Sequence, residues 1–491
     1  MAGRRDPRRP RQRARPARRL GPGAHVMHIH EAGAMHGDFS ALSPAWLGVP
    51  DDVNALLPQL WASGVERSDE GVLRVGGVPV GELAAEFGTP AYVLDEDDFR
   101  ARCRAWSKAF TGADVFYAAK AFCSKAVLRA AVEEGLNVDV CTAGELAVAL
   151  AAGIEPYRLG YHGNNKSLAE LRQAVELRVG RIVADSYTEI ERLDAIGAEL
   201  GVRPHVMVRV NVGVEAHTHE YIATAHEDQK FGFSLADGDA HEAARRVAAS
   251  PNMYLAGLHS HIGSQIFDTS AFEVSAARLV RLFAQLQGEI DEPMGELDLG
   301  GGFGMAYTSQ DDPQPPADIA ASLGKIVEAE CGAAGLPVPR LSIEPGRTLI
   351  GPAVFTLYEV GTVKPVTLSQ GASRLYVSVD GGMSDNIRPA LYDASYSATL
   401  ASRASRAAPV LARVVGKHCE AGDIVVKDEF LPADVAPGDL IAVPGTGAYC
   451  RSMGSNYNHV PRPPVIAVRH GEARVILARE TVDDLLRLDV G

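Results

Sequence analysis

The chain has 491 residues, too many for one small hydrophobic core, and this length predicts two domains. Hydrophobic residues make up 46% and charged residues 22%, as in an ordinary globular protein, and no apolar run reaches the roughly 20 residues of a membrane-spanning helix. The formal net charge of −14 gives no support for a nucleic-acid enzyme.

Arginine dominates the N-terminal segment, where the first twenty residues hold nine arginines against the single acid Asp6. Prolines and arginines in this proportion cannot form a core, and the segment lacks the apolar stretch of a secretory signal. We expect residues 1–35 to be a disordered extension, or to precede a true start at Met27 or Met35. A nucleic-acid-binding tail or a transit peptide is the alternative.

Lys120 follows the apolar run Val115–Ala119, at the C-terminal end of the first strand of a predicted barrel. This end is where α/β barrels assemble their chemistry, and a lysine amine in a partly desolvated pocket can form a Schiff base. Taken alone the signal is weak, because most lysines at strand ends are merely solvated. Asp139 and Glu145 follow with the second strand and are expected near Lys120.

Short apolar strands alternate with amphipathic helical stretches such as Thr188–Leu200 and Ala271–Glu289 over the middle of the chain. The predicted strands are Val115–Ala119, Val138–Val140, Arg158–Tyr161, Arg181–Asp185, His205–Val210, Tyr254–His259, Glu296–Leu299 and Arg340–Ile343. Eight strands alternating with helices over roughly 250 residues predict a TIM-type (β/α)8 barrel over residues 91–350.

After Gly351 the pattern changes to β-branched alternation interrupted by turn residues. The predicted strands are Ala353–Val360, Arg374–Val379, Val410–Val415, Ile424–Val426, Leu440–Val443, Pro464–Arg469 and Ala473–Leu477. They predict a second, mostly β domain over residues 351–491. A strand-like piece at Gly71–Val80 is expected to join the same sheet, so that residues 36–90 form the N-terminal part of this domain.

Six cysteines are scattered along the chain without a C-x-x-C pair. This pattern argues against a disulfide framework or a zinc site and predicts reduced thiols in a cytoplasmic enzyme. His217-Thr218-His219, with His226 nearby, could suggest a metal, but the H-x-H pair lacks the i, i+4 spacing of a helical site and a third ligand is not identifiable. We therefore expect no metal there, and a polar loop near the mouth of the site.

Nine segments that carry candidate chemistry follow one another along the chain. They are Tyr117–Lys120 (YAAK), His162–Ser167 (HGNNKS), His259–Gln265 (HSHIGSQ), Asp298–Gly304 (DLGGGFG), Glu344–Arg347 (EPGR), Asp380–Asp385 (DGGMSD), Ile387–Tyr392 (IRPALY), His418–Asp423 (HCEAGD) and Gly447–Tyr449 (GAY). In this order they resemble the diaminopimelate decarboxylases, in the alanine-racemase-like class of pyridoxal-phosphate (PLP) enzymes. The resemblance extends from about Gly71 to Gly491.

The turn Gly300-Gly301-Gly302 follows a predicted strand, and its bare backbone can bring amide N–H groups against a phosphate. A Rossmann fingerprint is the competing interpretation, but the glycines are contiguous and no acidic residue ends a second strand about 20 residues on. The resemblance implies a set of cofactor-binding residues around Lys120: His261, Ser264, Gly302, Glu344, Gly346, Arg347 and Tyr449.

Glu344 ends a strand, and a carboxylate there can keep the pyridine nitrogen of PLP protonated, because the charge pair favours the protonated ring. Related racemases place an arginine at that nitrogen, so a glutamate favours decarboxylation. The resemblance implies that His261 stacks on the cofactor ring. We expect the companion His259 to point to the opposite face of its strand and to be structural.

Arg347 and Arg388 carry guanidinium forks suited to the distal carboxylate of a dicarboxylic substrate, and Tyr392 can add a hydroxyl. The resemblance implies that Cys419 is the proton donor, that Glu420 contacts the distal amino group, and that both act in the partner subunit's site. Taken alone, Cys419 would be a buried small apolar residue. The implied substrate-binding set is Arg347, Arg388, Tyr392, Glu420 and Tyr449.

The sequence is thus interpreted as a PLP-dependent enzyme that converts meso-2,6-diaminopimelate to L-lysine, as a cytoplasmic homodimer with shared active sites and without membrane or nucleic-acid partners. A decarboxylase of ornithine, arginine, lysine or carboxynorspermidine is the alternative on the same fold, and the pair of Arg347 and Arg388 argues against it. A PLP-binding homeostasis protein without turnover is disfavoured, because such proteins are single barrels.

Overall fold

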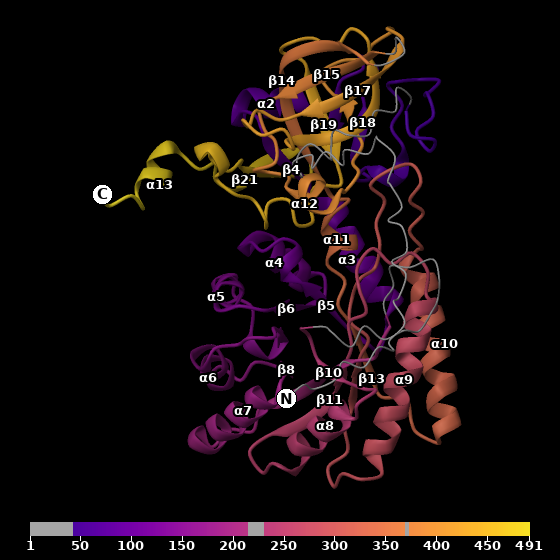
Figure 1. Ribbon diagram of the computed structural model, residues 1–491, viewed down its shortest axis with the longest axis vertical. Helices are drawn as coiled ribbons and strands as arrows, with labels where there is room; N and C mark the ends of the chain where they lie inside the picture. The colour runs from indigo at the N-terminus through magenta and orange to yellow at the C-terminus, as the bar shows by residue number, and fades with distance from the viewer. Residues whose placement is uncertain (1–42, 215–229, 369–372) are drawn as a thin grey trace, which may run out of the picture.

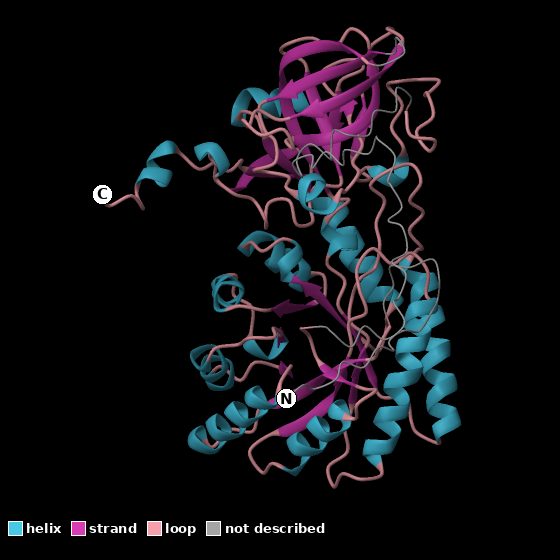
Figure 2. Ribbon diagram, viewed as in Figure 1, coloured by secondary structure: helices cyan, strands magenta, loops and turns pink. Residues whose placement is uncertain are grey.

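The computed structural model of the chain describes residues 43–214, 230–368 and 373–491. A barrel of strands with helices around it makes up the lower part of Figure 1, and a β-rich domain lies above it (Figure 2). The Arg-rich segment 1–35 and the histidines His217, His219 and His226 lie outside the described residues.

Within the described residues, eight parallel strands form a closed ring. They are β5 (Asp114–Ala118), β6 (Asn137–Val140), β7 (Leu159–Tyr161), β8 (Arg181–Ala184), β9 (His205–Asn211), β11 (Tyr254–His259), β12 (Glu296–Asp298) and β13 (Arg340–Ile343). The ring closes because β13 pairs with β5 and β8 pairs with β9. A short strand, β10 (Phe233–Ser234), pairs with the end of β9.

Helices follow the strands and cover the outside of the ring (Figure 2). They are α3 (Glu96–Ala109), α4 (Lys125–Glu133), α5 (Ala143–Ala151), α6 (Leu168–Glu176), α7 (Tyr187–Leu200), α8 (Asp239–Ala249), α9 (Ser270–Gln287) and α10 (Pro316–Ala334). Four of them begin after a Ser or Thr whose side-chain oxygen accepts a hydrogen bond from a first-turn amide: Ser124, Thr142, Ser167 and Ser186. Each cap fixes the residue at which the chain turns from loop to helix, and so fixes the loops at the C-terminal ends of the strands.

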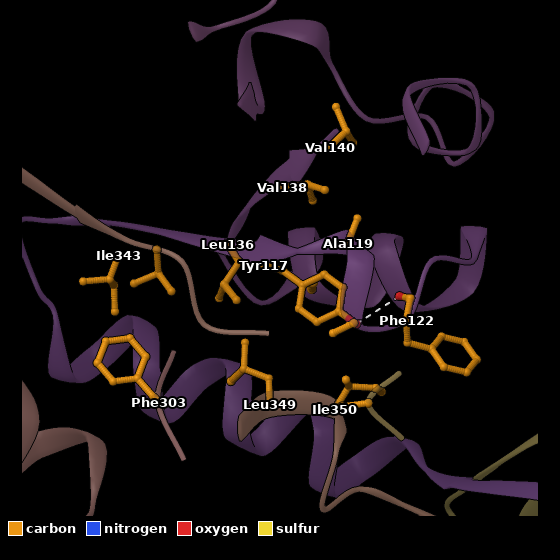
Figure 3. Packing of buried hydrophobic residues seen from close by; sticks show 14 of the residues in the cluster. Tyr117, Ala119, Phe122, Leu136, Val138, Val140, Phe303, Ile343, Leu349 and Ile350 are labelled. Carbon is orange, nitrogen blue, oxygen red and sulfur yellow. Dashed lines mark hydrogen bonds between the residues drawn. The ribbon is translucent and has the colours of Figure 1, made fainter. Parts of the chain in front are cut away.

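The turn that carries Lys120, η2 (Ala119–Ala121), is held by the core beneath it (Figure 3). Tyr117 is completely buried and packs in one cluster with Val138 of the neighbouring strand. Its hydroxyl donates a hydrogen bond to the carbonyl oxygen of Phe122 at 3.0 Å. Because this bond spans the turn, Lys120 leaves the core at a defined point.

The second domain is built on the long strand β14, which pairs with β4, β15 and β19. Its strands are β4 (Ala91–Asp95), β14 (Val354–Thr367), β15 (Ser373–Val379), β16 (Thr399–Leu400), β17 (Pro409–Val415), β18 (Ile424–Pro432), β19 (Leu440–Pro444), β20 (Val465–Arg469) and β21 (Glu472–Leu477). The order is β18-β17-β15-β14-β4-β20-β21, with β19 on β14 and β16 on β19. The predicted fold, a TIM-type barrel with a mostly β domain formed by segments before and after it, is confirmed.

The predicted strand at Gly71–Val80 is wrong. That part of the chain forms a separate three-stranded sheet followed by a helix: β1 (Val65–Arg67), β2 (Leu73–Val75), β3 (Val78–Pro79) and α2 (Val80–Phe87). Gly76 and Gly77 adopt φ of 53° and 83°, which turns the chain back between β2 and β3. The strand that enters the domain sheet from the N-terminal side is instead β4, between β14 and β20.

The β domain contacts the barrel beside the Lys120 turn. The amide of Tyr449 and the hydroxyl of Ser452 both donate hydrogen bonds to the carbonyl oxygen of Ala121, at 2.8 and 3.0 Å. Two short helices, α11 (Arg347–Ile350) and α12 (Arg388–Tyr392), lie where the two parts meet (Figure 1). The helix α13 (Val482–Leu486) lies near the C-terminus. In the part of the chain that the structure describes, no helix is long and apolar enough to cross a membrane.

Candidate active site

Lys120 lies where two cavities meet. Lys120 is exposed and lies in η2, the short turn that follows β5. One cavity, of about 610 Å³, is lined by barrel residues, and the other, of about 790 Å³, lies between the barrel and the β domain. Lys120, His261 and Glu344 line both cavities. The structure therefore brings the predicted Schiff-base lysine, ring-stacking histidine and carboxylate to one place.

Glu344 follows β13 and has only 8% of its side chain exposed. Its Oε1 lies 3.1 Å from Nε2 of His162 and 3.2 Å from Nε2 of His259. Burial alone would raise the pKa of Glu344, but His162 and His259 hold that pKa well below its usual range. The carboxylate is therefore ionised at neutral pH.

His162 follows β7 and lies between two carboxylates. Its Nε2 is 3.1 Å from Oε1 of Glu344 and 3.2 Å from Oδ1 of Asp139. Burial lowers the pKa of a histidine, yet these two carboxylates raise the pKa of His162 to about 9. Burial and the nearby Glu344 raise the pKa of Asp139 to about 6. At neutral pH the imidazole is thus a cation between two anions.

Arg181 adds a permanent positive charge to the same group. It is buried on β8, where its guanidinium pairs with Asp298 and donates a hydrogen bond to Oγ of Ser342 at 2.8 Å. Its Nη2 lies 3.8 Å from Oε1 of Glu344 and 4.0 Å from Oδ1 of Asp139. Three buried carboxylates are therefore balanced by one guanidinium and one imidazolium, which offsets the cost of burying charge.

His162, His259 and Glu344 also carry atoms of the kind that bind divalent metals, and these atoms lie within 4.8 Å of one another. A metal would need both imidazoles neutral, whereas the pKa of His162 is raised to about 9 and Nη2 of Arg181 is 3.8 Å from Glu344. The group is better described as an ion-pair cluster. That the site holds no metal stays a prediction.

His259 and His261 both line the barrel cavity, so the expectation that His259 points to the opposite face is wrong. Nε2 of His259 lies 3.2 Å from Oε1 of Glu344, which lines the same cavity. Nδ1 of His261 accepts a hydrogen bond from the amide of Gly301 at 3.2 Å. Burial and the charge of Lys120 hold the pKa of His261 well below its usual range, so its ring is neutral.

The glycine turn after β12 packs against the carbonyl groups around it. Gly302 has a φ of 108°, and a Cβ there would overlap the carbonyl oxygen of Gly263. A Cβ at Gly301 would overlap the carbonyl oxygen of Glu344 in the same way. Only a bare backbone fits, and Gly302 lines the second cavity together with Ser264. This cradle suits a phosphate group.

Arg347 begins α11 and, like Gly346, lines the second cavity. Its Nη2 donates a hydrogen bond to Oγ of Ser264 at 2.8 Å, and its Nη1 donates one to the hydroxyl of Tyr307 at 2.6 Å. The guanidinium lies 4.6 Å from the ring centroid of Tyr449. These contacts fix the direction of the guanidinium fork beside the glycine turn.

Arg388 begins α12 and is only 6% exposed. Its Nη1 donates a hydrogen bond to the hydroxyl of Tyr396 at 2.6 Å, and its guanidinium lies 4.8 Å from the ring centroid of Tyr307. Tyr392 lines the same cavity but is 61% exposed. Across the described ranges, the side-chain hydrogen bonds of Arg388 and Arg347 go to hydroxyl groups and not to carboxylates. Because burying an unpaired charge is costly, two such groups in one cavity favour an anionic ligand.

Cys419 and Glu420 lie in the turn between β17 and β18, and neither is among the described residues that line the two cavities. Cys419 is exposed, and its amide donates a hydrogen bond to Oδ1 of Asn458 at 3.1 Å. The carboxylate of Asp423 accepts a hydrogen bond from the amide of His418 at 2.7 Å and so holds the turn. The alternative in which Cys419 is a buried apolar residue is wrong.

Comparison with known proteins agrees with this geometry. Residues 96–351 match the family model described as the pyridoxal-dependent decarboxylase, pyridoxal binding domain. The diaminopimelate decarboxylase of Mycobacterium tuberculosis is 57% identical over 440 residues, which cover 89% of this chain and 98% of that protein. The chain belongs to the family of pyridoxal-dependent diaminopimelate decarboxylases.

Other members of the family match along nearly their whole length. The diaminopimelate decarboxylase of Bacillus subtilis is 44% identical, covering 88% of this chain and 98% of that protein. The crystal structure of diaminopimelate decarboxylase from M. jannaschii in complex with L-lysine has a TM-score of 0.81 at 28% identity, covering 88% of this chain and 98% of that one.

The residues of the site fit pyridoxal phosphate, the cofactor of this decarboxylase family. Oε1 of Glu344 and both ring nitrogens of His259 are buried without a hydrogen-bond partner among the described residues, so the cluster is polar and incompletely paired. Lys120 supplies an amine, Glu344 a carboxylate for the ring nitrogen, and the turn at Gly302 with Ser264 a phosphate cradle. The donors and acceptors of the site therefore match the groups of the cofactor.

Several residues of the site received no role from the sequence, among them His162, Tyr307 and Tyr396. Their hydrogen bonds and ion pairs with Glu344, Arg347 and Arg388 become visible only in the fold. His162 did carry one signal, because it directly follows a barrel strand, at the end where the other site residues gather.

Proposed function

We propose that the protein uses pyridoxal phosphate to decarboxylate meso-2,6-diaminopimelate to L-lysine and carbon dioxide. The observation that carries the proposal is the second cavity, in which Arg347 and Arg388, without carboxylate partners among the described residues, stand beside Lys120 and Glu344. A dicarboxylic amino acid supplies the missing anion, and ornithine or lysine does not. The name shared by the relatives supports the same substrate.

The cofactor-binding roles follow from position and charge. Lys120 provides the amine that tethers the cofactor, and the ionised Glu344 holds a proton on the pyridine nitrogen. When bound, pyridoxal phosphate supplies the electron sink that accepts the electron pair released as the α-carboxyl group leaves as carbon dioxide. The neutral ring of His261 borders the cofactor's face. The phosphate-binding residues are Ser264, Gly302, Gly346, Arg347 and Tyr449.

Recognition of the distal end of the substrate follows from charge. Arg347 and Arg388 pair with the distal carboxylate, and bidentate pairing sets its orientation. Tyr392 and Tyr449 border the same cavity and add hydroxyl groups. The distal ammonium needs an anionic partner as well, and Glu420 provides it.

We infer that Cys419 and Glu420 complete the site of a second copy of the chain. Both belong to a turn of the β domain outside the cavities of their own chain, and the Cys419 thiol is exposed. In the partner's site the thiol returns a proton to the carbon that has lost its carboxyl group. All six cysteines are free, which supports an enzyme that works in a reducing cytoplasm.

Product analysis tests the proposed function. Purified protein with its cofactor should release lysine and carbon dioxide in equal amounts from meso-diaminopimelate, and the Lys120→Ala variant should release neither. Absence of lysine from a preparation that carries pyridoxal phosphate on Lys120 would refute the substrate. Efficient decarboxylation of ornithine, arginine or lysine instead would establish the alternative on the same fold.

A further inference from the structure

His162 has no part in the chemistry above, although its side chain is 13% exposed and lies in the centre of the charged cluster. It is the nearest cationic group to Glu344 in the described structure, at 3.1 Å against 3.8 Å for Arg181. Its nitrogen reaches Asp139 at nearly the same distance, 3.2 Å. One imidazole nitrogen therefore joins a carboxylate from β6 to the carboxylate that faces the cofactor.

The two histidines that touch Oε1 of Glu344 differ in charge. Burial lowers the pKa of His259, so its ring is neutral, whereas the carboxylates of Asp139 and Glu344 raise the pKa of His162 to about 9 against the effect of burial. The rings are 5.1 Å apart, so a positive charge on His162 also disfavours one on His259. The charged groups that face His162 are thus Asp139, Glu344 and Arg181.

Removal of the His162 charge would leave the two carboxylates facing each other across a buried space. Each carboxylate raises the pKa of the other, and Arg181 alone would remain to balance them, so Asp139 and Glu344 would compete for one proton. A protonated Glu344 could no longer hold a proton on the ring nitrogen, and the cofactor would be a weaker electron sink. The reaction would slow without any loss of substrate contacts.

We propose that His162 is a positioning residue that keeps Glu344 ionised and fixes its Oε1, so that the carboxylate would be held ready for the ring nitrogen of the cofactor. The inference rests on the proposed function, because Glu344 acts on the substrate only through the cofactor. Asp139 is the second anchor of the imidazolium, which ties the position of Glu344 to β6.

The His162→Gln variant tests this role through rates and through the cofactor itself. We expect it to bind pyridoxal phosphate and to keep its KM for diaminopimelate, while kcat falls about tenfold to a hundredfold, the effect of losing the opposite charge that lies 3.1 Å from the Glu344 carboxylate. In the unaltered protein, kcat and the visible absorption of the bound cofactor should change as pH rises through about 9, where His162 loses its proton. The variant should lack this step.

Two further variants separate the role from general damage. His241→Gln is the matched control, because it removes a histidine–glutamate ion pair outside the active site, where Nε2 of His241 lies 3.0 Å from Oε2 of Glu289. It should leave kcat and the absorption titration of the cofactor unchanged. Asp139→Asn removes one of the two anions that stabilise the imidazolium, so the alkaline step should move to lower pH. A merely structural role for His162 predicts no such shift.

The outcomes are distinct. An unchanged kcat and an unchanged absorption titration in His162→Gln would overturn the proposal. If His162→Gln does not fold, the Asp139→Asn variant decides, and an alkaline step that stays in place would overturn it. If the unaltered protein releases no lysine but the cofactor absorption responds to both variants as expected, the proposed function fails and the positioning role stands.

Discussion

Replacing Arg388 with methionine should separate substrate recognition from cofactor binding. The guanidinium is 6% exposed and is held by the hydroxyl of Tyr396 at 2.6 Å and by the ring of Tyr307 at 4.8 Å. Methionine keeps an unbranched apolar stem against these rings and removes only the charged fork. Gly302 and Ser264, the proposed phosphate-binding residues, lie on other elements and should be undisturbed.

The size of the effect follows from burial. Taking one partner from a buried ion pair costs about 3–5 kcal/mol, because the other charge is left in a site closed to water. At about 1.4 kcal/mol per decade this corresponds to roughly two to three and a half decades in kcat/KM. Arg347 lines the same cavity and is proposed to share the distal carboxylate, so we expect the lower end, about a hundredfold loss.

Steady-state kinetics with diaminopimelate measures this loss, and the visible absorption of the cofactor shows that occupancy is unchanged. Tyr396→Phe is the matched control, because it removes one hydrogen bond from Arg388 but leaves the charge. A hydrogen bond to a charged group is worth about 1.5–3 kcal/mol, and we expect the lower end, about tenfold, because the guanidinium keeps its contact with the ring of Tyr307. If Arg388→Met also lost no more than about tenfold at full cofactor content, the charge argument would be refuted.

The remaining predictions concern attachment, assembly, stability and pH. Borohydride should fix the cofactor on the peptide that contains Lys120, and label on the Lys166 peptide would contradict the site. Lys120→Ala and Cys419→Ala chains, each inactive alone, should regain activity when mixed, because one site of the heterodimer keeps both the lysine amine and the cysteine thiol. A verified heterodimer without activity would place the whole site within one chain. Nζ of Lys166 lies 2.5 Å from the buried Glu189, and Lys166→Met leaves that carboxylate without its partner. The variant should lower the free energy of unfolding in urea by about 3–5 kcal/mol. A loss below about 1 kcal/mol would show that the pair contributes little to stability. Burial raises the pKa of Asp385 to about 7, above its unfolded value. The free energy of unfolding should therefore fall as pH rises from about 4 to about 7, and the Asp385→Asn variant should lack that fall. A urea midpoint of the unaltered protein that stays constant across this pH range would contradict the prediction.

The barrel could be predicted because its strands are short apolar runs between amphipathic helices. The predicted Tyr254–His259 and Arg340–Ile343 coincide with β11 and β13. The segment Gly71–Val80 could not be predicted in the same way, because an alternating pattern does not show where the backbone reverses. The positive φ of Gly76 and Gly77 makes two short strands from it.

The site could be predicted where one residue sits at a strand end, as Lys120 and Glu344 do. The ion-pair cluster could not, because it joins Asp139 of β6, His162 after β7 and Glu344 after β13. These residues meet only when the ring closes through the pairing of β13 with β5. The exposed position of Cys419 likewise depends on the turn between β17 and β18, which spacing alone does not determine.

The specificity ratio is the measurement on which the proposed substrate depends most directly. Diaminopimelate brings the distal carboxylate that Arg347 and Arg388 lack among the described residues, whereas lysine and ornithine bring no anion to that end of the cavity. The kcat/KM for diaminopimelate should therefore exceed that for either amino acid by about two decades or more. A ratio within about tenfold would contradict the substrate assignment and favour a decarboxylase of basic amino acids.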